Sequence, residues 1–287
     1  MEDSLKKFVF ILFLVLSQSS CNGNFFKELA TKTSDSARYE DALKSIDTGD
    51  YDSAIASILA TSTAYQADSK VIQTLAGAYA GKCGQDFISI ISGMSASAGA
   101  PFTFFMNIFT TISVVPASCS LAQTQIERLG ATAAVRTTDQ NIFMFILGIS
   151  KIGTYLKSVA DVLPATGVGG DGTTDAGFSS CRNQASMTDA QVKQVITGLG
   201  LVLDNVAAVG ASVSGSAAIT AISNFNAACV IAVGGSCTIT DVNSASITTA
   251  LLDYFRELIM TSDFGIGAAC TSAQALPVSG VSTTCCP

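Results

Sequence analysis

The sequence predicts an all-α protein, and three observations favour this class. Apolar residues recur at helical spacing through most of the chain. Serine, threonine or aspartate stands directly before several of these segments, where such side chains cap helix N-termini. Turns that contain glycine or proline separate the segments. Apolar residues make up 48% of the 287 residues, which is enough for a sizeable core.

Composition argues against several classes of function. Charged residues make up only 13% of the chain, about half of the usual share. The net charge is -7 and there is no basic stripe, so we expect no nucleic-acid partner. The chain contains no histidine, the commonest general base and zinc ligand. No familiar catalytic or nucleotide-binding motif is present. We therefore expect no enzyme activity, no cofactor and no metal site.

The first 21 residues have the pattern of a targeting segment. Lys6 and Lys7 precede an apolar run over residues 8–16, which is too short to span a bilayer. The following Ser17-Gln18-Ser19-Ser20-Cys21 resembles the processing box of bacterial lipoproteins. That resemblance implies a lipid on Cys21, the first residue of the mature chain, and a bacterial cell envelope location, in the outer membrane. Gln18 departs from the pattern, which usually carries leucine there. An ordinary secretory signal cleaved near Ser20 is the alternative.

The cysteine count agrees with export. Without a lipidated Cys21, eight cysteines remain, an even number suited to disulfides in an oxidising compartment. Cys285 and Cys286 are adjacent and therefore poorly placed to bond each other, so we expect them to reach different partners. The disulfide candidates are Cys83, Cys119, Cys181, Cys229, Cys237, Cys270, Cys285 and Cys286.

A helical pair is predicted after a short tether over residues 22–34. Ser34 or Asp35 can cap a helix over residues 37–47, and a return helix follows over residues 51–61. Three residues join them, so the two helices must lie antiparallel.

The turn and the start of the return helix read Gly49-Asp50-Tyr51-Asp52-Ser53-Ala54-Ile55, which resembles the centre of a tetratricopeptide (TPR) repeat. A second pair is expected from a helix over residues 69–80, a turn at 81–84 and a helix lined by Phe87, Ile88, Ile91 and Met94. Ala54, Ile88 and Ala122 are spaced by the 34-residue period of this repeat.

A third, diverged unit would comprise helices over residues 102–115 and 118–129. The resemblance implies that residues 35–136 stack as antiparallel pairs into a right-handed superhelix, with a compact helical bundle as the alternative. The end-of-repeat proline is missing from the first two units. If the pairs stack, Cys83 and Cys119 fall at neighbouring turns on one edge, which predicts a disulfide between them.

The second half, residues 137–269, is also expected to be helical. A helix over residues 139–163 is apolar over 142–149, so we expect it in the core, with Lys151, Lys157 and Asp161 at its more exposed end. A polar loop over 164–186 follows, in which Asp171 and Asp175 lack the spacing of a calcium site. Further helices are expected at 189–209, 215–230 and 243–260, before a cysteine-containing tail at 270–287.

The function expected from these features is binding. Stacked pairs form a concave surface lined by the first helix of each unit, which makes Tyr39, Gln73 and Gly77 the candidate contacts for a protein or peptide of the envelope. In the alternative, the uncharged helices 102–115 and 139–163 line an apolar cavity for a small molecule or lipid. That plan is similar to the lipoprotein T-component of TRAP transporters.

Overall fold

The computed structural model describes residues 33–86, 88, 90, 100–162, 170–182, 186–209, 226, 229–230, 237–267, 270 and 286. The signal and tether, Cys21, and most of the expected helix at 215–230 and of the tail lie outside these residues. The part of the chain that is described consists of helices and turns, with one isolated β-bridge between Thr261 and Cys270. The all-α prediction is confirmed for these residues.

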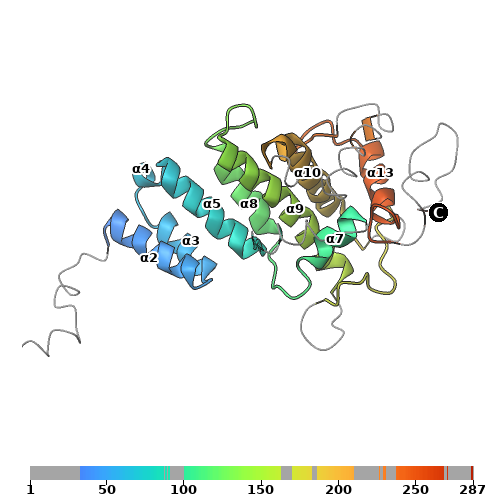
Figure 1. Ribbon diagram of the computed structural model, residues 1–287, viewed down its shortest axis with the longest axis horizontal. Helices are drawn as coiled ribbons and strands as arrows, with labels where there is room; N and C mark the ends of the chain where they lie inside the picture. Colours follow the sequence, from blue (N-terminus) through green and yellow to red (C-terminus); the bar gives the residue numbers. More distant parts are fainter. Residues whose placement is uncertain are drawn as a thin grey trace, which may run out of the picture.

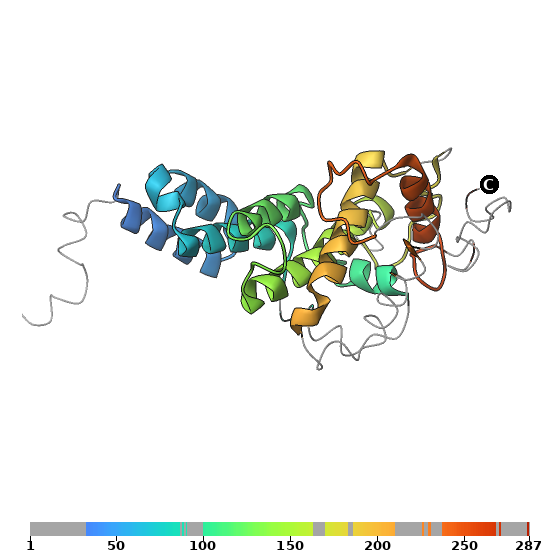
Figure 2. The same ribbon diagram turned by 90° about the horizontal axis from the view of Figure 1, so that it is seen from above.

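The helices follow one another along an elongated molecule (Figures 1 and 2). They are α2 (Asp35–Asp47), α3 (Tyr51–Leu59), α4 (Thr63–Gln66), α5 (Ser69–Cys83), α7 (Pro101–Asn107), α8 (Ala117–Glu127), α9 (Thr138–Ala160), α10 (Asp189–Asn205) and α13 (Thr249–Ile259), with a 3-10 turn over Val206–Val209. In both views α2–α5 and α13 lie at opposite ends, and α9 runs through the middle.

The first helical pair forms as predicted. Ser34 caps α2 by accepting the backbone N–H of Ala37, and Asp50 caps α3 by accepting that of Ser53. α2 packs against α3 and α3 packs against α5, around a small core of Tyr39, Ala42, Ala54, Ile55, Ile58, Val71, Leu75 and Ala78. The short helix α4, between α3 and α5, was not anticipated.

The second expected pair differs from the prediction. α5 continues through the expected turn to Cys83 and ends at Gly84, whose φ of 110° only glycine adopts readily. Ile88, expected on the inner face of the next helix, is 77% exposed, whereas Ile90 is fully buried. The 34-residue step therefore fails at this position. Phe87, Ile91 and Met94 lie outside the described residues.

The third expected pair is not built as predicted. α7 ends at Asn107, where Thr110 donates its hydroxyl hydrogen to the Asn107 carbonyl and the chain continues in turns. α7 packs against α9, whereas α8 packs against both α5 and α9. The packed pairs after the first are therefore α5–α8 and α9–α10. The side chains of Phe102, Phe105, Met106 and Phe109 are fully buried.

Helix α9 is the centre of the core. Every side chain from Met144 to Thr154 is buried, and α7, α8 and α10 pack around it. A Cβ on Gly148 would lie 2.6 Å from the Gly198 carbonyl of α10, so the two helix backbones touch at these glycines. By length and composition α9 could span a membrane, but 67% of its most apolar window is buried inside the protein. The central helix of a bundle has the same property.

The prediction that Lys151, Lys157 and Asp161 mark a more exposed end of this helix is wrong. Lys151 and Asp161 are fully buried, and Lys157 is half-buried and donates to the Ile112 carbonyl. Helical spacing identified the apolar stretch, but it could not show that α8 would cover the face that carries Lys151. The Asp161 carboxylate instead accepts the backbone N–H groups of Asp171 and Gly172.

The last helix begins later than expected. Residues around Asp241 form a turn, in which the Asp241 carboxylate accepts the Asn243 backbone N–H. Thr248 then caps α13 by accepting the Leu251 N–H. Arg256 on α13 is buried and donates to the Ser180 and Met187 carbonyls and to Asp189, which ties α13 to the start of α10.

Disulfides link segments both distant and near in sequence. Cys83 and Cys119 are joined, as the stacking argument predicted, although both lie in helices rather than in turns. Cys181 bonds Cys286, and Cys229 bonds Cys237. The Cys83–Cys119 bond spans 36 positions and ties α5 to α8, a constraint worth roughly 3 to 4 kcal/mol.

Close approach of Tyr51 to α5 gives the first prediction. A Cβ on Gly81 would lie 2.2 Å from the Tyr51 ring, so Gly81→Ala should lower the free energy of unfolding by about 1–3 kcal/mol. Gly77 lies on the same helix with nothing within 4 Å of a Cβ, so Gly77→Ala should instead stabilise by up to about 1 kcal/mol. Chemical denaturation of both variants checks this. Equal effects of the two substitutions would contradict the Tyr51 contact.

Candidate functional site

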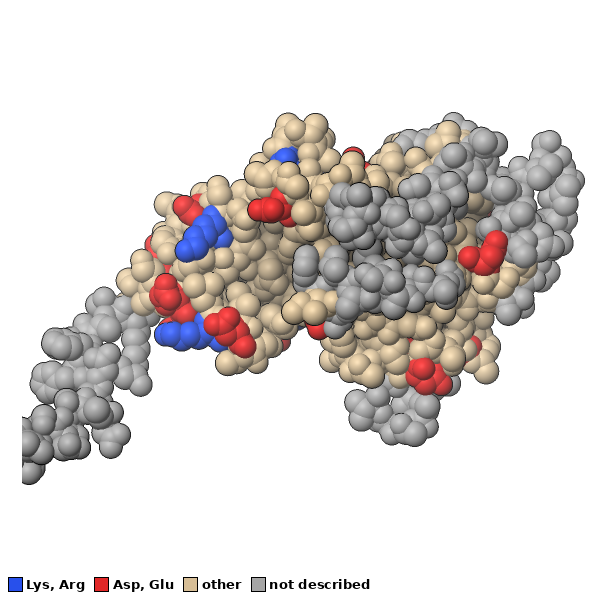
Figure 3. Space-filling model, viewed as in Figure 1, with Lys and Arg blue, Asp and Glu red and all other residues tan. Residues whose placement is uncertain are grey.

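A hollow of about 660 Å³ lies where the N-terminal ends of α2, α4 and α5 meet. Its walls come from these three helices and from the caps that precede α4 and α5. The lining residues are Asp35, Ser36, Tyr39, Glu40, Ser62, Ala64, Tyr65, Asp68, Lys70 and Val71. On the face shown in Figure 3, the charged side chains gather mainly over this end of the molecule.

Two tyrosines form the aromatic part of the hollow. The rings of Tyr39 and Tyr65 meet edge to face with centroids 6.0 Å apart. The Tyr39 hydroxyl is 2.8 Å from the Thr74 hydroxyl on α5, and the Lys70 ammonium lies 5.5 Å from the centre of the Tyr39 ring. Tyr39 is thereby held in a fixed orientation, and the hollow presents a π surface to which an ammonium group already binds.

One wall is fixed by Asp35. Its carboxylate accepts the Ser62 backbone N–H at 2.9 Å and also the Ser62 hydroxyl hydrogen. These bonds, the side-chain bond first, lower the pKa of Asp35 below its ordinary value. The contact joins the first turn of α2 to the cap of α4, so it holds the short helix and Tyr65 in place.

The hollow is acidic. Three carboxylates line it, from Asp35, Glu40 and Asp68, against one ammonium, from Lys70. Asp68 also caps α5, because its side chain accepts the Lys70 backbone N–H. Asp68 and Glu40 are exposed at the rim. The excess of negative charge beside two aromatic rings favours a ligand that carries cationic and apolar groups.

The predicted contact residues are only partly brought together. Tyr39 lines the hollow, but it is just 4% exposed and acts as part of the floor rather than as a protruding contact. Gln73 is exposed and Gly77 half-buried on α5, and neither is among the lining residues. Sequence reasoning missed Tyr65, Asp68 and Lys70. The available signal was the pair of cap residues Ser62 and Asp68, which indicates two helix starts in quick succession.

A second hollow, of about 520 Å³, surrounds the turn at residues 49–52. It lies between that turn, the end of α5 and residues 112–115. An ion pair between Lys82 and Asp52 joins two of its walls. The Gly-Asp-Tyr turn therefore contributes to this hollow and not to the one at the helix starts.

The helices considered as walls of an apolar cavity pack directly against each other. A Cβ on Gly153 of α9 would lie 2.2 Å from the Phe105 carbonyl of α7, and the Phe109 ring is equally close-packed. Their apolar side chains belong to one continuous core cluster with those of α10 and α13.

No known protein family, curated protein or solved structure matches this chain. Among the described residues, no group of three or more histidine, cysteine, aspartate or glutamate side chains is placed to hold a metal ion. Function has to be inferred from the hollow at the helix starts and from the chemistry of its lining.

The Asp35–Ser62 contact gives a pH-dependent prediction. Because folding lowers the pKa of Asp35, its contribution to stability is present above the unfolded value of about 3.9 and is lost as the pH falls through the lower folded value. Asp35→Asn should therefore destabilise at pH 7, and the difference from wild type should shrink below about pH 3. Urea unfolding at both pH values measures this, with Asp47→Asn at the other end of α2 as the control. A difference that persists unchanged at low pH would rule out the ionised carboxylate as its source.

Proposed function

We propose that this protein is a binding or scaffold protein, and that the hollow between α2, α4 and α5 receives a segment of a protein or peptide partner. The observation that carries the proposal is the combination of an open hollow of about 660 Å³, an edge-to-face tyrosine pair and three lining carboxylates. Tyrosine is enriched in protein-binding sites, whose rims are polar.

The partner segment proposed is basic. A lysine or arginine side chain would meet the Tyr65 ring and the carboxylates of Glu40 and Asp68, while its aliphatic stem covers the tyrosine pair. Surface charges of this kind act over about 8 Å at physiological salt, so binding should weaken as salt increases. An acidic or nucleic-acid partner would meet repulsion from the lining and from the net charge of -7.

Peptide binding tests the proposed role of the hollow between α2, α4 and α5. Basic, neutral and acidic peptide libraries presented to the protein should yield basic binders, and Tyr65→Ala or Asp68→Asn should weaken those binders roughly tenfold or more. Asparagine also caps helices, so Asp68→Asn removes the charge and leaves α5 capped. The matched control is Gln73→Ala, an exposed position of α5 outside the lining. Loss of binding in the Gln73 variant alone would place the contact surface elsewhere on α5.

We also propose that the chain acts in the bacterial cell envelope, held to the outer membrane by a lipid on Cys21. The support is the residue pattern before Cys21 and the presence of disulfides, which form in oxidising compartments.

Cell fractionation tests the proposed lipid anchor, and its result does not depend on whether the hollow binds a peptide. The wild-type chain should remain with the membrane fraction after a salt wash and should incorporate labelled palmitate. Cys21→Ser should abolish the label. A wild-type chain that is released in soluble, unlabelled form would mean an ordinary secretory signal instead.

A further inference from the structure

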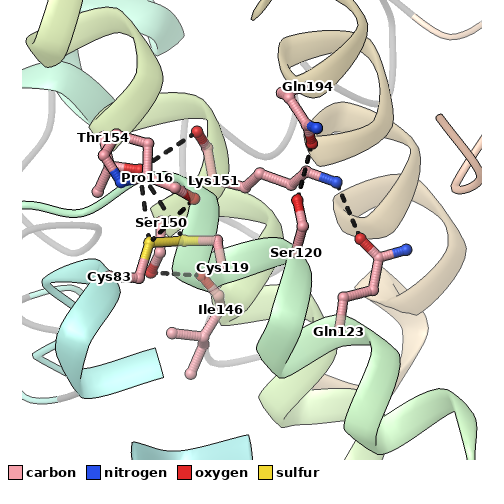
Figure 4. The surroundings of a disulfide bond; sticks show 10 residues. All are labelled: Cys83, Pro116, Cys119, Ser120, Gln123, Ile146, Ser150, Lys151, Thr154 and Gln194. Atoms are coloured by element: carbon pink, nitrogen blue, oxygen red, sulfur yellow. Dashed lines mark hydrogen bonds between the residues drawn. A yellow bond between two sulfur atoms is a disulfide. The ribbon is translucent and has the colours of Figure 1, made fainter. Parts of the chain in front are cut away.

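The most unusual buried group in the protein is the amine of Lys151. Its side chain is fully buried in the middle of α9 and points at α8, as Figure 4 shows. Lysine is almost never fully buried without a compensating partner. The partner here is uncharged: Nζ donates to Oε1 of Gln123 at 2.9 Å, and Gln123 is itself only 6% exposed.

The amide of Gln123 is held from its other side by a carboxylate. Its Nε2 donates to Oε1 of Glu127, one turn further along α8, at 2.7 Å, and to the Thr240 carbonyl at 2.9 Å. An amine therefore lies at the carbonyl end of the amide, and a carboxylate lies at its NH₂ end. The carbonyl carbon that Nζ would attack is one bond from the oxygen that Nζ contacts.

The protonation state suits the amine for attack. Burial lowers the pKa of Lys151 to about 7, and the negative charges of Glu127 on α8 and of Asp241, in the turn before α13, oppose this shift. The lowered pKa raises the fraction of neutral amine at neutral pH far above that of a free lysine, for which it is fewer than about one in a thousand. Only the neutral form is a nucleophile.

We propose that Lys151 and Gln123 form an intramolecular isopeptide bond, with Glu127 as the proton carrier. Nζ attacks the side-chain carbonyl carbon of Gln123, and a new carbon–nitrogen bond forms as the bond to Nε2 breaks. In the tetrahedral intermediate Nζ and Nε2 are bonded to the same carbon, so Glu127, which already contacts Nε2, can take the proton that Nζ loses and deliver it to Nε2, which leaves as ammonia. The amine and the amide yield the isopeptide and ammonia, so the step needs no oxidant, reductant or co-reactant.

The surroundings favour this outcome over hydrolysis. Lys151 and Gln123 are buried, so water is kept from the carbonyl carbon. Glu127 is half-buried, which leaves a path to solvent for ammonia at that end. The bond would join α8 to α9 beside the disulfide that joins α5 to α8, and Thr154 of α9 already contacts both sulfur atoms (Figure 4). Three central helices would then be linked covalently, one of the links being insensitive to reduction.

Mass spectrometry of the reduced, full-length chain tests the bond. Wild type should be lighter than its sequence mass by one ammonia molecule. Lys151→Met and Glu127→Gln should each show the mass that their sequence requires. Digestion of wild type should release a branched peptide in which Lys151 is joined to Gln123, and this peptide excludes ammonia loss elsewhere. Lys193→Met, a substitution of a lysine on α10, is the control and should keep the mass deficit.

The pH dependence of the free energy of unfolding provides a second readout, which does not rely on a mass difference between variants. A free buried amine with a lowered pKa makes the unfolded state bind more protons between about pH 7 and pH 10, so stability relative to Lys151→Met would rise over that range. An amide nitrogen does not titrate, so the crosslinked protein should show no such rise. A wild-type chain of unaltered mass, or one that shows the rise, would overturn the proposal.

Discussion

The structure depends on the burial of α9 on every side. Its apolar stretch must be covered by other elements, and α7, α8 and α10 supply that cover. Glycines make the contact close: Gly148 meets Gly198 of α10 backbone to backbone, and Gly153 meets the Phe105 carbonyl of α7. Side chains larger than hydrogen at these positions would push the neighbouring helices outward. The arrangement of the other helices therefore follows from how closely they can approach this one.

Complete burial of α9 also encloses polar groups on it or beside it, and two of them have a defined structural role. Asp161 satisfies backbone N–H groups of the following loop, and Thr154 contacts the Cys83–Cys119 disulfide. Lys151 is the exception, because its acceptor is a neutral amide rather than a carboxylate. An isolated buried charge is costly. Loss of the charge, first by deprotonation and then by acylation, removes that cost and converts a weak point of the core into a covalent link.

The two proposed sites use opposite properties of the chain. The hollow at the helix starts is open, acidic and close to solvent, and its short helix α4 is held through the Asp35–Ser62 contact. The Lys151 cluster is enclosed and lies between α8 and α9 in the middle of the fold. The proposed binding site at one end thus adjoins a middle section with a disulfide link and, by our proposal, an isopeptide link.

Several features were predictable because they depend on local physics. The cap at Ser34, the antiparallel α2–α3 pair and the burial of residues 144–149 follow from cap chemistry, a three-residue turn and apolar spacing. The Cys83–Cys119 pairing was predicted from stacked repeat units, and the bond is present although it joins helices α5 and α8 and not two turns. The hollow was not predictable, because Tyr65 belongs to a helix of 4 residues that is too short to show a period, and because no local pattern places Lys70 of α5 over the Tyr39 ring of α2.

The sequence by itself determined the helical class, most helix starts and the excess of acidic charge, since each is written in neighbouring residues. Tertiary structure decided which helices pair and which polar side chains become enclosed. Residues 102–115 were predicted to form half of a repeat unit with the helix at 118–129. In the structure α7 packs against α9, and α8 packs against α5. Lys151 reads as a surface residue, yet α8 covers it. Both outcomes depend on contacts between segments far apart in the chain. The spacing of apolar residues shows which face of one helix is buried, but it does not show which other helix covers that face.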